Sequence, residues 1–243
     1  MKNNNWSINQ GMNIVLGVIF ILAILLSAYT MAAIAFPYLV PPFPTDIDFL
    51  ESKQWVVDEW HWLAAFYIHI TSAVLVLAAG LTQFSKTLMF KYPQWHRVIG
   101  KIYVFLVLVV AGPSGFVMAF YGNGGFWARC AFVAQAVFWW WLTYKAYQTI
   151  KQKKLRKHGK YMLRSYAMTL SAISLRGATY IVSAWKMKHG IFCPNATYQL
   201  LCYPDFYILV AWLSWIVNLM VAEFLIVLGI MNYYFPKEAQ KDK

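Results

Sequence analysis

The chain has 243 residues, of which 60% are hydrophobic and 12% are charged, and its formal net charge is +12. Soluble globular domains hold about a quarter charged residues and less than half apolar residues. The composition therefore disfavours a soluble enzyme, a disordered chain and a small disulfide scaffold. It predicts a protein dissolved in lipid, and the length accommodates one bundle of about six spans, since each span needs roughly 20 apolar residues.

Six apolar stretches follow one another along the chain, at residues 13–36, 62–84, 98–121, 126–146, 161–185 and 206–231. They lack the alternation of apolar and polar residues that marks the strands of a membrane barrel. Backbone amides in hydrocarbon must find their partners within the segment, so these stretches are expected to be helices. The predicted fold class is an all-α integral membrane protein, a six-transmembrane-helix bundle in which residues 1–243 form a single domain.

The basic residues favour one side of this topology. Of the 21 Lys and Arg residues, sixteen fall on the side that both termini share, and the opposite side holds Lys53, Arg129, Lys186 and Lys188. Basic residues gather on the cytoplasmic side of membrane proteins. The sequence thus predicts a multi-pass protein of the bacterial cytoplasmic (inner) membrane with both termini inside.

The Lys and Arg residues gather on one predicted side of the membrane and do not form a continuous basic surface. No nucleic-acid partner is therefore expected. The expected partner is the lipid bilayer, and another membrane protein or a second copy of the chain is a further alternative. Residues 37–61, with Pro41-Pro42-Phe43-Pro44 and an acidic stretch, are expected to cap the bundle on the outer side. Cys193 and Cys202 share a predicted outer loop, where a disulfide and two free thiols are both open, because spacing alone does not prove pairing.

Few ionisable residues fall inside the predicted spans, and each is a functional-site hypothesis because a charge in hydrocarbon is costly. They are His69, Arg176 and Glu223, with Gln135 and Asn218 as polar neighbours. At 1.5 Å per residue, His69 and Arg176 fall about 10 and 14 Å from the outer surface, and Glu223 falls about 25 Å from it. We assign His69 and Arg176 as candidate catalytic residues of an outward-facing pocket. The alternative for His69 is a plain hydrogen bond between helices.

The third stretch contains Gly112-Pro113-Ser114-Gly115 at about the same level as His69. Proline has no backbone N–H and clashes with the preceding turn of a helix. A kink is therefore predicted here, with backbone carbonyls left unpaired beside the pocket.

A second cluster lies at the predicted inner boundary. His96 opens the third stretch just after Pro93, His158 opens the fifth, and Gln83 closes the second at the same level. Two helices that each carry a histidine near their start can supply both axial imidazoles of one haem. We predict His96 and His158 as the metal ligands of a haem b. The alternative is that both histidines anchor in the lipid headgroups.

Haem propionates need nearby cations, which the same helix starts supply. The further residues assigned to cofactor binding are Arg97, Lys101, Arg164 and Gln83. Gly100 would let a flat macrocycle approach the backbone of the third helix.

The order of these residues resembles a known family, a bacterial family of predicted membrane proteins of unknown function (domain of unknown function 2306). The resemblance covers about residues 60 to 180 and implies no reaction. It rests on His69, on Gly80-Leu81-Thr82-Gln83-Phe84, on Trp95-His96-Arg97-Val98-Ile99-Gly100-Lys101-Ile102-Tyr103, on His158, on Met162-Leu163-Arg164-Ser165-Tyr166-Ala167 and on Leu175-Arg176.

A more distant likeness is to the ascorbate-reducible transmembrane b-type cytochromes. Those six-helix proteins hold two haems, with histidines paired between helices two and four and between helices three and five. The likeness implies that His96 and His158 form the second of these pairs. His69 is similar to half of the first pair, but the fourth helix here has no histidine, and Gln135 is a poor replacement ligand. The resemblance thus implies one haem and a pocket at His69 and Arg176 that would hold a quinone or another small reductant or anion.

Three functions fit the sequence. The first is a haem b-binding membrane redox protein, an oxidoreductase that passes electrons between a membrane quinol or small reductant and a partner. The second is a transporter or proton-coupled permease with a path through His69, Arg176 and Glu223, although the sequence has no inverted repeat. The third is a non-catalytic membrane subunit of a larger complex. Phosphate-binding and hydrolase motifs are absent from the sequence.

Overall fold

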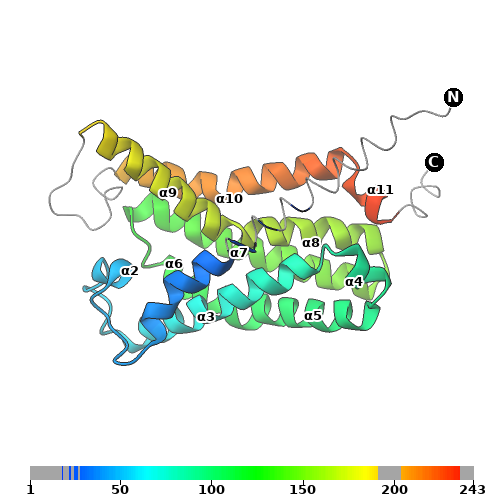
Figure 1. Ribbon diagram of the computed structural model, residues 1–243, viewed down its shortest axis with the longest axis horizontal. Coiled ribbons are helices and arrows are strands. Elements are labelled where there is room, and N and C mark those ends of the chain that lie inside the picture. The colour runs from blue at the N-terminus through cyan, green and yellow to red at the C-terminus, as the bar shows by residue number, and fades with distance from the viewer. Residues whose placement is uncertain (1–17, 19–21, 23–24, 27, 191–203, 236–243) are drawn as a thin grey trace.

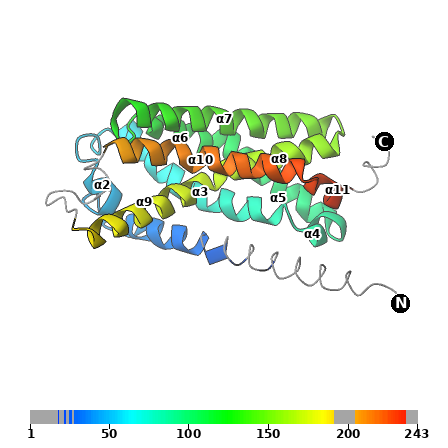
Figure 2. The same cartoon turned by 90° about the horizontal axis from the view of Figure 1, so that it is seen from above.

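The computed structural model describes residues 18, 22, 25–26, 28–190 and 204–235, and these residues form helices and turns without a strand. The long helices lie side by side along the longest axis of the molecule (Figures 1 and 2). After the helix Ala28–Leu39 the elements are α2 (Asp48–Glu51), α3 (Trp60–Thr82), α4 (Lys86–Phe90), α5 (Pro93–Phe105), η1 (Leu106–Ala111), α6 (Gly112–Ala119), α7 (Gly125–Lys151), α8 (Leu155–Thr169), α9 (Ser171–Lys188), α10 (Pro204–Val227) and α11 (Ile230–Tyr234).

Three helical stretches in the described part of the chain are long and apolar enough to cross a membrane: Trp60–Thr82, Pro93–Ala119 and Phe206–Val227. The prediction of an all-helical membrane protein is confirmed at this level. Helix α7 has 27 residues and the necessary length, but its centre carries Gln135 and the run Trp139–Trp141, whose polar atoms lower its hydropathy. The helix Ala28–Leu39 is apolar but short in the residues that the structure describes.

The predicted span 161–185 is not one helix. It divides at Leu170 into α8 and α9. Side chains replace backbone partners at the break: Asn218 Nδ2 donates to the Ala167 carbonyl at 3.2 Å, and the Ser171 hydroxyl donates to a carbonyl one turn earlier. A broken helix is tolerated at membrane depth when such groups satisfy the freed backbone, so the break needs this tertiary setting.

The predicted span 98–121 begins earlier than expected, at Pro93, which occupies the first turn of α5. A π-helical turn, η1, then separates α5 from α6, and α6 starts at the predicted kink, Gly112-Pro113. Single π-helical turns inside α-helices are frequent at functional sites. Here the turn brings the Ala111 carbonyl to a histidine of α3, as described below.

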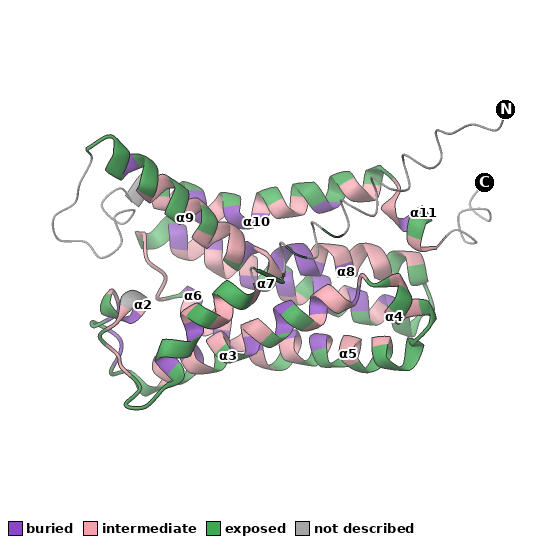
Figure 3. Cartoon of the chain, viewed as in Figure 1, coloured by how far each residue is buried: buried purple, intermediate pink, exposed green. Residues whose placement is uncertain are grey.

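The most buried part of the bundle lies between α3, α5, α7 and α8, where Figure 3 shows buried positions facing the interior. A chain of hydroxyl groups joins three of these helices. Tyr103 Oη lies 2.8 Å from Ser165 Oγ and 3.0 Å from Thr169 Oγ1, and Ser165 Oγ lies 2.6 Å from Thr143 Oγ1. Interhelical hydrogen bonds of this kind hold membrane helices in register, because apolar side chains gain little by leaving lipid.

Residues 40–59 fold over one end of the bundle, which we call the α2 end. Tyr38, Leu50, Trp62 and Phe66 form an apolar cluster there. The buried ammonium group of Lys53 donates to the Tyr121 carbonyl and to Asn123 Oδ1 in the turn between α6 and α7. The segment expected to cap the bundle therefore does so through one buried cation as well as through apolar packing.

Burial and the neighbouring Arg129 lower the pKa of Lys53 from 10.5 to about 8. Between pH 8 and 10.5 the unfolded chain holds more protons than the folded chain, so the free energy of unfolding should rise with pH by about 3 kcal/mol from this group. We expect the difference in unfolding temperature between wild type and Lys53→Met to increase across this window. Thermal unfolding in detergent at several pH values measures it, with exposed Lys188→Met as the control. An unchanging difference would contradict a buried, charged Lys53.

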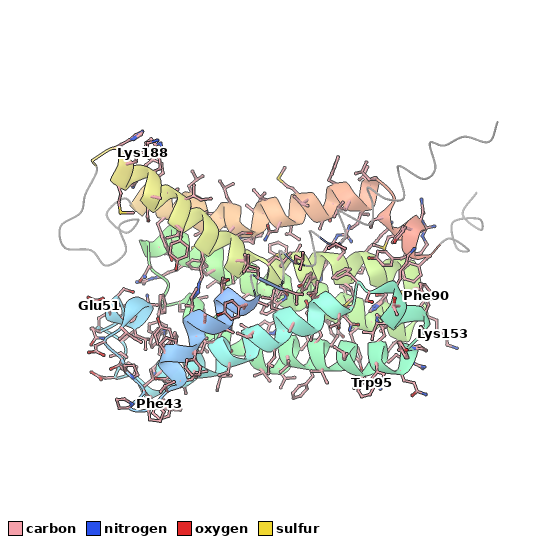
Figure 4. All side chains as sticks on the ribbon, in the orientation of Figure 1. Phe43, Glu51, Phe90, Trp95, Lys153 and Lys188 are labelled. Carbon is pink, nitrogen blue, oxygen red and sulfur yellow. The ribbon has the colours of Figure 1, made fainter. Side chains whose placement is uncertain are left out.

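Residues that the topology prediction places on opposite sides of the membrane lie at opposite ends of the bundle. Figure 4 shows Glu51 and Lys188 at the α2 end, and Trp95 and Lys153 at the other end, which we call the α11 end. Cys193 and Cys202, for which a disulfide and two free thiols are both open, lie outside the described residues. Cys130, in α7, is a free thiol.

Candidate functional site

A partly open cavity of about 150 Å3 lies toward the α2 end, between the helix Ala28–Leu39, α3, α7 and the α8–α9 break. His69 and Arg176, the two candidate catalytic residues, both line it, together with Gln135, Thr169 and Ser171. The structure thus brings together two residues that are 107 positions apart in the sequence. Their assignment to one pocket came from helix depth alone.

Helix α6 fixes the orientation of the His69 ring. His69 Nδ1 lies 2.9 Å from the Ala111 carbonyl oxygen, which can only accept a hydrogen bond, so Nδ1 carries the proton. A Cβ atom at Gly115 would lie 2.7 Å from His69 Cε1, which means that only glycine leaves room for the ring here. The second nitrogen, Nε2, is therefore a hydrogen-bond acceptor in the neutral ring, and the His69 side chain is half-buried.

Arg176 has an unusual environment for a cation. Among the described residues its hydrogen-bond partner is the sulfur of Met31, 3.6 Å from Nη1. A thioether is a weak acceptor, and a guanidinium stays charged at any pH that a protein encounters. Gln135 does not compensate, because its amide donates to Ser171. The cavity therefore holds a cation whose charge no carboxylate in the described part of the chain neutralises.

The two predicted haem ligands lie at the α11 end. His96 is the fourth residue of α5, and His158 is the fourth residue of α8. His158 Nδ1 lies 2.9 Å from the Ala146 carbonyl of α7, so Nδ1 donates and Nε2 is left as an acceptor. His96 Nδ1 is buried and has no hydrogen-bond partner among the described residues. Within the described part of the chain, His158 therefore leaves Nε2 available and His96 leaves Nδ1 available.

The other residues assigned to cofactor binding differ in their surroundings. Gln83 is buried and packs on Gly100 of α5, where its Oε1 would lie 2.8 Å from an added Cβ. Gly100 therefore makes room for this side chain in the structure. Arg97 donates to the Pro93 carbonyl and is exposed, and Lys101 is also exposed, so both cations can reach a ligand at the bundle surface.

Arg164, the remaining residue assigned to cofactor binding, is engaged in an ion pair. It makes a two-pronged ion pair with Glu223 of α10, in which Nη2 lies 2.8 Å from Oε2. The pair lies in an open groove of about 760 Å3 between α7, α8 and α10, which is lined otherwise by apolar and aromatic side chains such as Trp141 and Trp215. Glu223 therefore lines a different space from His69 and Arg176. The geometry gives no support to a transport path through these three residues.

Removal of one partner of this pair should cost more than removal of both. A charge left without its partner in a membrane helix is costly, whereas a hydrogen-bonded pair is partly compensated. We expect Arg164→Ala and Glu223→Ala each to lower the unfolding temperature of the purified protein more than the double variant does. Strictly additive effects in this double-mutant cycle would contradict the pairing.

No group of three or more His, Cys, Asp or Glu residues that could hold a metal ion is found in the described ranges. A haem iron with two imidazole ligands needs only two protein ligands, because the porphyrin supplies the other four. This finding therefore does not bear on a haem held by two histidines.

Residues 66–226 match the family described as predicted membrane protein (DUF2306). The chain belongs to this family. The matched stretch contains His69, His96, His158, Arg176 and Glu223. Membership of DUF2306 agrees with the resemblance noted in the sequence, and it identifies the chain as a membrane protein without assigning a reaction. No curated protein and no solved structure matches the chain.

Sequence reasoning missed two features of the DUF2306 chain that shape its sites. It did not predict the hydroxyl chain at Tyr103, because single Ser, Thr and Tyr residues in apolar helices carry no recognisable pattern. It also did not predict the hydrogen bond from His69 Nδ1 to the Ala111 carbonyl. The Gly112-Pro113 pair was the available signal, since it predicted a freed carbonyl at this depth but not its partner.

Proposed function

We propose that the chain is a membrane redox protein that holds one haem b between His96 and His158 and passes electrons between a membrane quinol or small reductant and a partner. In this proposal six helices span the bacterial inner membrane, with both termini and the haem-binding end in the cytoplasm. The observation that carries it is the pair of half-buried imidazoles near the starts of α5 and α8 at one end of the bundle, where His96 Nδ1 has no hydrogen-bond partner among the described residues.

The tautomers support axial ligation. A ligating histidine donates its other ring N–H to a carbonyl or carboxylate, which orients the ring and raises its basicity. His158 has this arrangement, because its Nδ1 donates to the Ala146 carbonyl and its Nε2 is an acceptor. His96 contributes a buried ring nitrogen without a partner among the residues described, which is costly unless a ligand satisfies it.

The surrounding residues fit the edges of such a cofactor. Arg97 and Lys101 are exposed on α5 within two turns of His96 and could pair with propionates. Gln83 lies against Gly100 at the level of the histidines and would have to shift for a macrocycle to approach α5 there. When bound, haem supplies one-electron transfer between ferric and ferrous iron.

The visible spectrum of the purified protein tests the proposal. The full chain, expressed with haem available, should show a Soret band that shifts on reduction with dithionite. Mass spectrometry of the same sample establishes that the chain is intact. An intact, folded and colourless protein would overturn the proposal.

A further inference from the structure

We propose that the cavity at His69 and Arg176 binds a small 2-hydroxy monocarboxylate, a molecule of the size and chemistry of lactate or glycolate. This site is separate from the histidine pair at the α11 end, and the proposal does not depend on haem. Three observations carry it: the volume of the cavity, a cation that no carboxylate in the described part of the chain neutralises, and the acceptor nitrogen of the half-buried histidine.

The volume limits the occupant to a small molecule. About 150 Å3 corresponds to the space of about five water molecules in the liquid. Ligand pockets for drug-sized molecules are commonly about 300 to 1,000 Å3. A substituted quinone ring with its isoprenoid tail belongs to that larger class, whereas a three-carbon acid fits the space that the structure provides.

The cation selects an anion with planar oxygens. Arg176 faces a cavity in which its partner among the described residues is a thioether, so its guanidinium can still donate two parallel hydrogen bonds. A carboxylate accepts such a pair of bonds in a fixed geometry. Because the charge lies within the helical bundle, binding of a monoanion would also remove the cost of an isolated cation there.

The histidine selects a hydroxyl group beside the carboxylate. The Ala111 carbonyl holds the proton on His69 Nδ1, so Nε2 presents a lone pair. A carboxylate alone has no proton to donate to it, and its charge would meet that lone pair unfavourably. A hydroxyl on the neighbouring carbon donates to Nε2 while the carboxylate stays on Arg176. Gln135 Nε2 donates to the Ser171 hydroxyl, which in turn donates to the Met168 carbonyl, so this Gln135 N–H and the Ser171 proton are already engaged.

Ligand-observed NMR on the purified full chain tests this assignment. Saturation transfer to the methyl protons of lactate should appear with wild type and be displaced by glycolate. Propionate lacks the hydroxyl, and lactamide lacks the charge, so each should bind at least about tenfold more weakly, since a buried polar group is then left unpaired. Propionate that binds as tightly as lactate, or chloride that displaces lactate at equal concentration, would overturn the choice of ligand class.

Variants separate the two contacts. Arg176→Gln should lose lactate binding, whereas Lys188→Gln, an exposed cation on the same helix, should leave it unchanged. His69→Phe should abolish the preference for lactate over propionate, and His69→Gln, which keeps an acceptor oxygen, should retain part of it. Unaltered binding in Arg176→Gln would overturn the proposal.

The outcome is independent of the haem proposal. Recording the visible spectrum of each NMR sample shows whether a colourless protein still binds lactate or a coloured protein fails to do so. A colourless protein that binds lactate would overturn the proposed redox function alone. A coloured protein that does not bind lactate would overturn the proposed 2-hydroxy acid site alone.

Discussion

His96→Ala and His158→Ala should each abolish most of the Soret absorbance per mole of purified protein. Each substitution removes one axial imidazole, and a single remaining ligand holds haem b weakly in detergent. His158→Ala also removes the hydrogen bond from the His158 ring to the Ala146 carbonyl of α7. The measurement is the ratio of Soret to protein absorbance after purification, with haem supplied during growth.

The matched control is His69→Ala, a substitution of the same type in the other cavity. We expect it to keep the Soret band, because His69 lies toward the α2 end, with its Nδ1 on the Ala111 carbonyl. A band that survives at full strength in either His96→Ala or His158→Ala would show that the ligand pair is misassigned. Loss of the band in His69→Ala alone would transfer the ligand role to the outer cavity.

Gly80→Ala should destabilise the protein strongly. A Cβ atom at this position of α3 would overlap the ring of Tyr166 and lie 2.9 Å from Tyr103 Cε2. Neither ring can swing away freely, because Tyr166 Oη donates to the Leu77 carbonyl and Tyr103 Oη bonds to Ser165. Overpacking of this kind costs about 3 kcal/mol. We expect the unfolding temperature to fall by about 10 °C.

Gly177→Ala is the matched control for this prediction. Gly177 is also a helical glycine, in α9, but an added Cβ would meet no atom within 4 Å. Alanine favours helix over glycine by about 1 kcal/mol, so this variant should be as stable as wild type or slightly more stable. Equal effects of the two substitutions would mean that α3 does not pack on the two tyrosines as the structure has it.

The helical class and the approximate positions of the long helices followed from the sequence, because hydrocarbon admits only segments that satisfy their own backbone. The break between α8 and α9 at Leu170 did not follow from the sequence. The residues around it, including Ser165, Thr169 and Ser171, are ordinary in a membrane helix when seen singly. The break is stable because Asn218, which is 48 positions from Leu170, donates to the carbonyl of Ala167.

The candidate sites show the same division. Helix depth placed His69 and Arg176 at one level, and both do line one cavity. Depth along the helix also predicted that Arg164 lies beside the inner histidines. In the structure, Arg164 forms an ion pair with Glu223 of α10 instead. Depth along a helix can be counted from sequence, whereas the direction around the helix axis depends on which neighbour it packs against.

The sequence by itself determined that the protein lies in a membrane, that it is helical, and how deep each ionisable residue lies along its helix. These properties depend on the composition of each segment alone. The tertiary structure decided which of those groups meet. It gave His69 a carbonyl that fixes its tautomer, left Arg176 without a carboxylate in the described part of the chain, and gave His158 a carbonyl of α7. These pairings depend on the packing of helices distant in sequence, and no local pattern of residues specifies them.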